Sequence, residues 1–270
     1  MIPAGRRFYK MSGSGNDFVF VDARSEAPGR LGEPTIVGAV CGRGTGVGAD
    51  GIVFLEPSSV GAVKMTYLNA DGSRAMCGNA ALCATRLSIE LGVAPASGFV
   101  LETDSGPLPV RQTSELPEID LASAKGVQPT FETSLASGER RIGFADTGVP
   151  HLVIECDDVD GVDVVGRGRP LRRLRSLPTG ANVNFVSRHA QGWRMRTYER
   201  GVEAETLACG TGAVAIAILL REWGAAGNET TLITRSERPL KVRLERKGEC
   251  WHPTLSGEAR IVFVGQLGEY

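Results

Sequence analysis

Two cysteines stand in matching sequence contexts in the two halves of this chain of 270 residues. Cys77 opens the segment CGNAALCATRL and Cys209 opens CGTGAVAIAIL, and each is followed by a glycine, a polar residue and a helical stretch. A cysteine at the N-terminus of a helix has its thiolate stabilised by the helix dipole, and the free N–H groups there can bind a carboxylate. Two such cysteines facing one substrate could remove a proton from one side and return one from the other. Cys77 and Cys209 are therefore the leading candidates for acid–base chemistry.

The helices that must position these cysteines are predicted over Asn79–Leu91 and Thr211–Trp223. Their first residues, an asparagine and a threonine, are types that favour the N-cap position. Gly92 and Gly224 follow the two stretches where a glycine commonly ends a helix. The second helix contains AVAIAILL, which is apolar on every side, so we expect it to run through the middle of its domain.

The cysteine contexts belong to an internal duplication. Four pairs of segments recur in the same order at offsets of 131 to 134 residues, which indicates the copying of a whole domain. We expect an α/β protein of two pseudo-symmetric domains, with residues 1–117 plus 262–270 in the first and 118–261 in the second. The segment 114–121 is the expected crossover, and the last strand is expected to return to the first domain. The paired segments are GNDFVFVD with VPHLVIEC, GADGIVF with GANVNFV, CGNAALCATRL with CGTGAVAIAIL, and LETDSGPLPV with LITRSERPLKV.

Composition excludes several classes of protein. Thirty basic and thirty-one acidic residues give a formal charge of −1, so electrostatics gives no reason to expect binding to nucleic acid or to an anionic membrane. The longest apolar run, Ala213–Leu220, is far shorter than a membrane span, and no secretory signal is visible, so a cytoplasmic protein is expected. Six sparse cysteines without a CxxC pair, and three histidines, predict neither a disulfide framework nor a metal site. Four of the cysteines are expected to serve packing alone: Cys41, Cys83, Cys156 and Cys250.

The sequence also offers patterns for two other kinds of site, a dinucleotide-binding loop and the catalytic site of a cysteine hydrolase. Residues 46–51 fit GxGxxG and residues 210–215 fit GxGxxA, but the first precedes an apolar strand and the second lacks a compact strand–turn–helix–strand unit. A cysteine hydrolase that uses His151 as its base is also conceivable, but it leaves the second helix-start cysteine unexplained.

Several motifs along nearly the whole chain resemble those of the diaminopimelate epimerase family. The most specific is ERGVEAETLACGTG at 199–212; the others are GSGNDFVFVD (13–22), NADGSRAMCGNA (69–80), TGVPHLV (147–153), GANVNF (180–185) and LSGEARIVFVG (255–265). The resemblance implies two pseudo-symmetric α/β domains, each a curled mixed sheet around a central helix. It also implies an epimerase that interconverts LL- and meso-diaminopimelate for lysine biosynthesis, without PLP or another cofactor.

The resemblance also assigns roles to matching positions. Cys77 corresponds to the proton donor and Cys209 to the proton acceptor for the LL substrate, while His151 and Glu199 correspond to a polar pair that tunes the site and binds the reacting amino group. Arg200 suits a carboxylate because its planar fork can bind both oxygens. The expected substrate-binding positions are Asn16, Asn69, Gly78, Asn79, Asn182, Glu199, Arg200, Gly210 and Thr211.

Some positions depart from the family pattern. Val149, Leu82 and Gly51 stand where the family often has asparagine, arginine and glutamine. These departures leave open a racemase of the same fold acting on another amino acid, such as histidine, or a non-catalytic relative that binds an amino acid. The resemblance further suggests a homodimer built on strands of the first domain, with Tyr270 or its neighbours near the contact.

Overall fold

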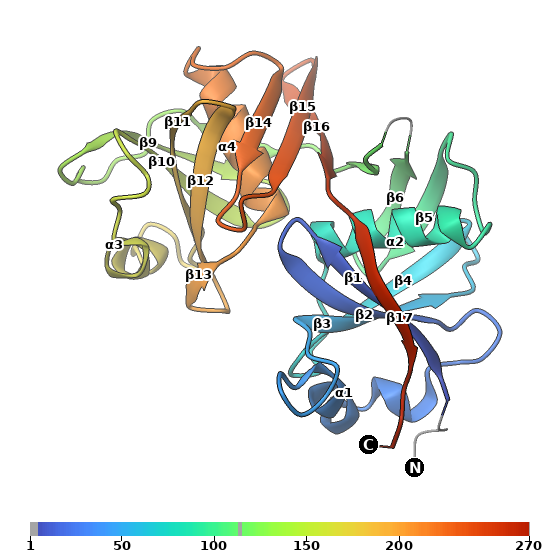
Figure 1. Ribbon diagram of the computed structural model, residues 1–270. Coiled ribbons are helices and arrows are strands. Elements are labelled where there is room, and N and C mark those ends of the chain that lie inside the picture. Colours follow the sequence, from blue (N-terminus) through green and yellow to red (C-terminus); the bar gives the residue numbers. More distant parts are fainter. Residues whose placement is uncertain (1–4, 113–114, 270) are drawn as a thin grey trace. The chain divides into compact units, whose positions relative to one another are not determined.

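The computed structural model of the protein describes residues 5–112 and 115–269. The chain divides into two compact units (Figure 1). Unit 1 takes in the chain up to Ile119 together with the segment from Gly257 onward, and unit 2 comprises Asp120–Ser256.

Unit 1 contains a mixed sheet of short strands. Its strands lie in the order β17-β1-β2-β3-β4-β5-β6-β7. The pairs β2–β3 and β4–β5 are parallel, and the other neighbouring pairs are antiparallel. The last strand of the chain thus lies beside the first. The strands are β1 (Arg7–Gly13), β2 (Asn16–Asp22), β3 (Gly51–Glu56), β4 (Val63–Asn69), β5 (Phe99–Thr103), β6 (Gly106–Arg111), β7 (Glu118–Asp120) and β17 (Arg260–Gln266).

The sheet of unit 1 is buried on both faces because helices cover each of them. Val19 and Val21 of β2 join one core cluster with residues of α1 (Pro34–Cys41), which follows the short 3-10 helix η1 (Gly29–Gly32). Alternate residues of a strand point to opposite faces, so Phe18 and Phe20 point away from that cluster. Both phenylalanines are fully buried, and α2 (Gly78–Glu90) packs against β1, β2 and β4.

Unit 2 contains a sheet with the same sequence of pairings. β9 pairs antiparallel with β10, β10 parallel with β11, β11 antiparallel with β12, β12 parallel with β14, and β14 antiparallel with β15. β8 pairs with β9 as β17 pairs with β1. The strands are β8 (Lys125–Gln128), β9 (Glu139–Asp146), β10 (Pro150–Cys156), β11 (Asn182–His189), β12 (Gly192–Glu199), β13 (Ala204–Thr206), β14 (Glu229–Ile233), β15 (Pro239–Lys247) and β16 (Cys250–Gly257).

The helices also repeat between the units. α4 (Gly210–Glu222) follows β13 as α2 follows β4. The next strand after α2 is β5, which pairs parallel with β4, and the next strand after α4 is β14, which pairs parallel with β12. Residues Gly212–Leu220 of α4 are all buried, and the helix contacts β9, β10, β11, β14 and β15. The α/β architecture expected from the duplication is confirmed, including the burial of AVAIAILL.

One helix of unit 2 was not expected from the sequence. α3 (Val164–Arg172) contains two glycines and a proline, residues that disfavour helices. Asp163 caps it, accepting a hydrogen bond from the Gly166 N–H at 2.9 Å. Gly168 permits close packing, because a Cβ there would lie 2.5 Å from the Cβ of Tyr198. Tertiary contact and capping therefore outweigh the poor helical propensity.

The bounds of the two main helices differ slightly from expectation. Each begins and ends one residue earlier than predicted, with Cys77 and Cys209 as the N-caps. The expected helix ends are confirmed, since Gly92 and Gly224 have φ angles of 67° and 66°, in the left-handed region. Among the helices of the described residues, none is long and apolar enough to cross a membrane.

Candidate active site

Cys77 and Cys209 occupy equivalent positions at the starts of α2 and α4. Both have extended backbone conformations, with φ of −131° and −141°, and neither side chain makes a capping hydrogen bond. Gly78 and Gly210 are the first helical residues. The first N–H groups of a helix have no partner within it and carry the positive end of the helix dipole. Each thiol therefore stands at a helix end suited to stabilising a thiolate and to binding a carboxylate.

The prediction that Asn79 and Thr211 cap these helices is wrong. Both lie inside the first turn, because the backbone already turns helical at the preceding glycine. The side chain of Asn79 instead donates from Nδ2 to Oδ1 of Asn16 at 2.7 Å. The Thr211 hydroxyl lies 3.7 Å from Sγ of Cys209.

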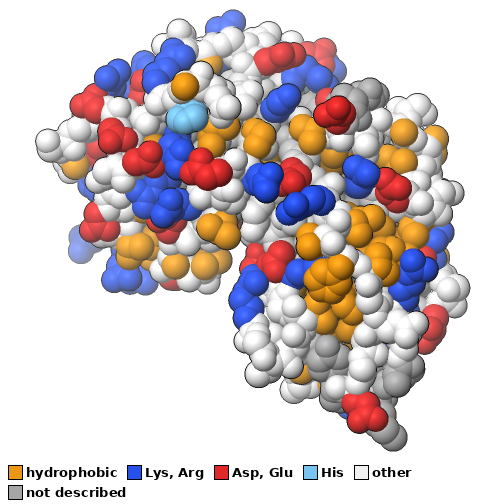
Figure 2. Space-filling view, in the orientation of Figure 1, with side chains coloured by type: hydrophobic (Ala, Val, Ile, Leu, Met, Phe, Trp, Pro, Cys, Tyr) orange, Lys and Arg blue, Asp and Glu red, His pale blue; other side chains and the backbone are white. Residues whose placement is uncertain are grey.

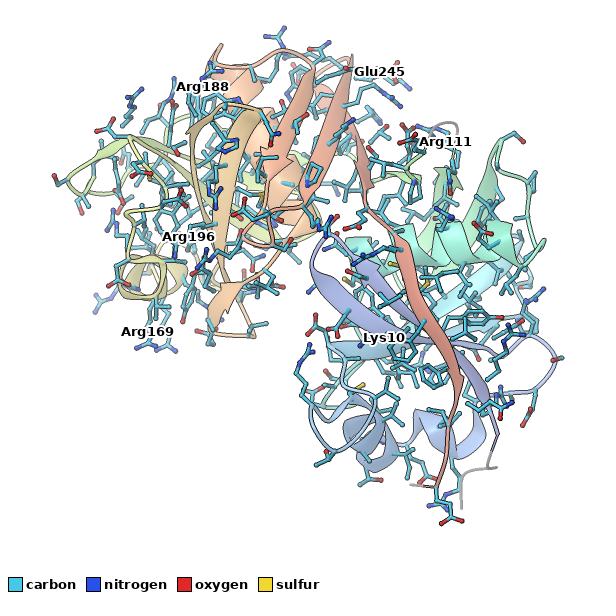
Figure 3. The ribbon with its side chains drawn as sticks, viewed as in Figure 1. Lys10, Arg111, Arg169, Arg188, Arg196 and Glu245 are labelled. Atoms are coloured by element: carbon cyan, nitrogen blue, oxygen red, sulfur yellow. The ribbon has the colours of Figure 1, made fainter. Side chains whose placement is uncertain are left out.

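In unit 1, a network of hydrogen bonds and ion pairs holds the side chain of Asn16 next to the first turn of α2. Asn16 Nδ2 donates to Oδ2 of Asp50 at 3.0 Å, and the other oxygen of that carboxylate accepts from Arg43 at 2.8 Å. Arg43 also binds Asp17, which accepts a further hydrogen bond at 2.6 Å from the buried Lys10 of β1 (Figure 3). The structure thus links Asn16 to the first turn of α2 on one side and to a cluster of charges on the other.

Asn69 lies at the end of β4 in a tight turn. Its side-chain amide donates to the Ser73 hydroxyl at 3.0 Å, and the N–H of Gly72 donates to the carbonyl of Asn69 at 2.8 Å. Asp71 accepts from the N–H and the hydroxyl of Ser73 at 2.8 and 2.6 Å. These contacts are those of an ordinary turn, so the hydrogen bonds of Asn69 within unit 1 are structural.

His151, Asn182 and Asn184 form a buried polar cluster in unit 2. His151 is fully buried near the start of β10, with Nδ1 3.0 Å from Nδ2 of Asn184 and Nε2 3.5 Å from Nδ2 of Asn182. Burial, together with the positive charge of Arg200, lowers the pKa of His151 to about 3. The imidazole is therefore neutral at physiological pH.

Glu199 and Arg200 lie where β12 ends, and both are half-buried. The Arg200 N–H donates to Oδ1 of Asn182 at 2.8 Å, and its guanidinium donates to the carbonyl of Thr179 at 3.1 Å. Arg200 and Asn182 are therefore held together within unit 2.

Sequence reasoning missed several polar residues of these networks, among them Asp50 and Asn184. Asn184 could have been found from the sequence, because it lies two residues from the expected site residue Asn182 on one strand, and alternate residues of a strand share a face. Its Oδ1 would lie 2.4 Å from a Cβ placed on Gly212, and the Cys209 sulfur would lie 3.1 Å from that Cβ. The glycine at this position lets the Asn184 amide reach the first turn of α4, beside the cysteine.

The remaining cysteines differ from the two at helix starts. Burial raises the pKa of Cys41 to about 11 and that of Cys156 to about 12, and it raises the pKa of Cys83 well above the usual value. These three thiols are buried and stay protonated at neutral pH, in keeping with a packing role. The expectation of packing is wrong for Cys250, which is exposed at the first residue of β16.

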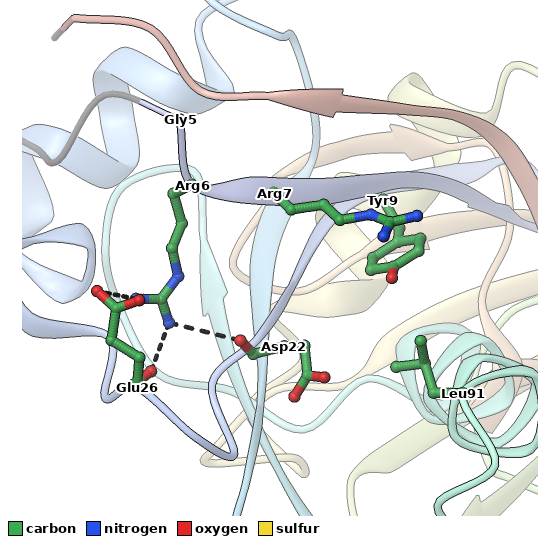
Figure 4. Close-up of a pocket in the computed structure, with 7 residues that line it drawn as sticks. All are labelled: Gly5, Arg6, Arg7, Tyr9, Asp22, Glu26 and Leu91. Carbon is green, nitrogen blue, oxygen red and sulfur yellow. Dashed lines mark hydrogen bonds and ion pairs between the residues drawn. The ribbon is translucent and has the colours of Figure 1, made fainter.

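A surface pocket in unit 1 contains none of the expected site residues (Figure 4). Arg6, which lines it, pairs with the Glu26 carboxylate at 2.7 Å and donates to the carbonyl of Asp22 at 3.5 Å. Its charge is thus engaged by the protein itself.

Solved structures identify the class of fold. A phenazine biosynthesis protein of the PhzF family from Bacillus anthracis matches with a TM-score of 0.75 at 14% identity, over 97% of this chain and 98% of that protein. A hydroxyproline epimerase from Agrobacterium vitis matches with a TM-score of 0.71 at 17% identity, over 99% and 93% of the two chains. The fold is the duplicated one found in PhzF proteins and amino-acid epimerases.

Sequence comparison narrows this class to one family. The diaminopimelate epimerase family matches residues 8–126 and 143–262, one stretch in each half. Relatives named diaminopimelate epimerase include one from Gemmatimonas aurantiaca, 48% identical over 96% of this chain and 98% of its own length. Another, from Aquifex aeolicus, is 36% identical over 97% and 98% of the two chains. The chain belongs to the diaminopimelate epimerase family.

Proposed function

We propose that this protein interconverts LL- and meso-diaminopimelate in lysine biosynthesis by proton transfer at one α-carbon, without PLP. Family membership gives the reaction, and the observation that carries the mechanism is the equivalent placement of Cys77 and Cys209 as N-caps of α2 and α4. One thiolate removes the α-proton from one face while the other thiol donates a proton to the opposite face. After turnover the protonation states of the two sulfurs are exchanged.

The helix starts support both steps of this reaction. An α-hydrogen is a very weak acid, so the developing carbanion needs electrostatic stabilisation, which preorganised N–H groups supply. The N–H groups of Gly78–Asn79 and Gly210–Thr211 bind the carboxylate next to the reacting carbon. In the direction from LL to meso, Cys209 accepts the proton and Cys77 donates it.

The other expected residues hold the rest of the substrate. Glu199 binds the reacting ammonium group, His151 completes the polar surroundings, and Arg200 binds the distal carboxylate. Asn16, Asn69 and Asn182 bind the remaining polar groups. The hydrogen bond of Asn182 to the Arg200 backbone supports a shared role for these two residues.

The decisive experiment is α-hydrogen exchange in D₂O without added PLP. LL- and meso-diaminopimelate should each incorporate deuterium and interconvert, whereas histidine and other amino acids should not. Exchange with histidine but not with diaminopimelate would instead indicate a racemase of different specificity, consistent with the departures at Leu82, Gly51 and Val149. Binding without exchange of any amino acid would indicate a non-catalytic relative.

The protein is further proposed to act as a cytoplasmic homodimer that binds no nucleic acid. β17 supports the homodimer, because Val262, Phe263 and Val264 are each 45 to 49% exposed on three consecutive positions. Hydrophobic side chains gather on the face of unit 1 around this strand (Figure 2). A second copy would remove that apolar surface from water. Tyr270, also expected near the contact, lies outside the described residues.

A further inference from the structure

The orientation of two asparagine amides in unit 2 determines the protonation of His151. Asn184 Nδ2 lies 2.9 Å from the carbonyl oxygen of Leu152, and its Oδ1 accepts from the Thr197 hydroxyl at 2.9 Å. A carbonyl oxygen only accepts hydrogen bonds, so the atom that faces it must be the amide nitrogen. The same NH₂ group lies 3.0 Å from Nδ1 of His151. Asn184 therefore presents a donor to Nδ1.

Asn182 is fixed in the same way from the other side of the ring. Its Oδ1 accepts from the backbone N–H of Arg200 at 2.8 Å, and a backbone N–H only donates. The NH₂ group of Asn182 is therefore the atom group that faces Nε2 of His151, at 3.5 Å. Both ring nitrogens thus face amide donors.

A neutral imidazole has one N–H and one lone pair. The closer donor is that of Asn184, so the lone pair belongs at Nδ1 and the proton at Nε2. The Asn182 amide cannot accept from that proton, so it needs an acceptor from elsewhere. A doubly protonated ring would direct both N–H groups at amide donors, which agrees with the lowered pKa of His151 and with the nearby positive charge of Arg200.

We propose that Asn184 is a positioning residue that holds His151 as the neutral Nε2–H tautomer, so that His151 acts as a hydrogen-bond donor to a substrate carboxylate oxygen and never as a base. An amino-acid substrate offers acceptors only in its carboxylates, because its ammonium groups only donate. The contact with substrate rests on the proposed function, whereas the tautomer does not. This assigns the reacting ammonium group to Glu199 alone.

The test uses ¹⁵N-labelled full-length protein and two-bond ¹H–¹⁵N correlation spectra of the histidine rings between pH 5 and 8. The chain has three histidines, and His151→Gln identifies the signals of His151 by their loss. In the unmodified protein without substrate, Nε2 should be protonated and Nδ1 unprotonated throughout this range. A proton on Nδ1, or titration of the ring between pH 5 and 8, would overturn the proposal.

Two matched variants test which amide sets the tautomer. Asn184→Asp replaces the donor at Nδ1 by an acceptor, so the proton should appear on Nδ1 and kcat should fall about 10²-fold, the scale of losing one preorganised donor. Asn182→Asp keeps the acceptor for Arg200 and places an acceptor at Nε2, so the Nε2–H tautomer should persist. Retention of the Nε2–H tautomer in Asn184→Asp would show that Asn184 does not control it.

The spectra also separate this proposal from the proposed function. If Asn184→Asp fails to fold, as judged by its circular dichroism, the spectra of the unmodified protein and of Asn182→Asp still decide the tautomer. If His151 has the expected tautomer but the protein does not epimerise diaminopimelate, the proposed function is contradicted and this inference stands. Epimerisation by a protein whose His151 carries its proton on Nδ1 would contradict this inference alone.

Discussion

Asn79 Nδ2 donates a 2.7 Å hydrogen bond to Oδ1 of Asn16, joining the first turn of α2 to the start of β2. The Asp50 carboxylate, which only accepts, binds Nδ2 of Asn16 and so forces its Oδ1 toward Asn79. The Asn79 Oδ1 that remains is buried without a hydrogen-bond partner among the described residues. Asp50 thus sets the hydrogen-bond direction of the two amides, Asn16 and Asn79, that lead to the first turn of α2, the helix that Cys77 caps.

Asp50→Ala should therefore impair the enzyme although Asp50 is not an expected substrate contact. Loss of the carboxylate frees the Asn16 amide to rotate, and misplacement of a binding group can reduce kcat/KM by roughly 10–100-fold. The matched control is Asp22→Ala at the end of β2, the strand that Asn16 begins, and it removes an ion pair with Arg24. Equal kinetics for Asp50→Ala and Asp22→Ala would show that the amide chain has no role in catalysis.

Cys77→Ala and Cys209→Ala should each abolish epimerisation and leave the fold intact, because each removes an obligatory acid or base. Deuterium incorporation and the rate of interconversion of LL- and meso-diaminopimelate measure the loss, and circular dichroism checks the fold. Cys250→Ala, which changes an exposed thiol, is the control and should keep full activity. Near-normal turnover by either of the first two variants would rule out a two-thiol mechanism.

Arg200→Lys should weaken substrate binding although the charge is kept. Lysine lacks the planar fork that binds both oxygens of a carboxylate, and the loss should be about 1.5–3 kcal/mol, the scale of a charged hydrogen bond. We expect a rise in KM for diaminopimelate of roughly 10-fold or more, by the usual conversion of free energy to binding constant. Arg173→Lys, at an exposed arginine near Glu203, provides the comparison and should change KM little. If both variants bind substrate equally well, the distal carboxylate is held elsewhere.

Phe263→Asp should dissociate the proposed homodimer, since it places a charge in the apolar surface of β17. Light scattering coupled to size-exclusion chromatography should then report the mass of one chain in place of two. Val60→Asp changes a similarly exposed apolar residue in a loop of unit 1, so it should leave the dimer unchanged. A monomeric unmodified protein, or a dimer that survives Phe263→Asp, would contradict the assignment to β17.

Asp17 should make the stability of unit 1 depend on pH. Burial alone would raise the pKa of Asp17, but hydrogen bonds from Arg43 and Lys10 outweigh it and hold the pKa below the usual value. A carboxyl group whose pKa is lower in the folded than in the unfolded protein stabilises the folded state at pH values above its pKa in the unfolded chain. That stabilisation is lost as the pH falls through the pKa of the group in the folded protein. Urea unfolding of Asp17→Asn should therefore show reduced stability at pH 7, with a difference from the unmodified protein that shrinks toward pH 3. A difference that stays constant across this range would show that the ionisation of Asp17 does not contribute.

Sequence periodicity and internal comparison predicted much of the scaffold. The duplication anticipated two equivalent sheets, and two of the repeated segments, GNDFVFVD and GADGIVF, contribute β2 and the first part of β3. The apolar run in α4 identified a buried helix because a helix that is apolar on every side has no face for solvent. Gly92 and Gly224 marked the helix ends because only glycine adopts the left-handed conformation at little cost.

The missed helix α3 shows where local propensity fails. Gly166, Gly168 and Pro170 disfavour a helix, yet the Asp163 cap and the close approach of Gly168 to Tyr198 stabilise one there. The contact joins residues thirty positions apart, so no local pattern contains it. The N-caps were misplaced by two residues, since Cys77 and Cys209 occupy the positions expected for Asn79 and Thr211. The side chain of Asn79 finds its partner in Asn16 and not in its own helix.

The sequence by itself determined the duplicated architecture, the two helix-start cysteines and the family, because these depend on periodicity, repetition and motifs that are contiguous along the chain. Only the tertiary structure decided which groups the polar side chains meet: Asp50 with Asn16, and Asn184 with both His151 and the first turn of α4. Hydrogen-bond direction and burial arise from atoms brought together by sheet pairing and helix packing. The protonation of His151 therefore follows from three neighbouring strands in unit 2 and from no single segment of the chain.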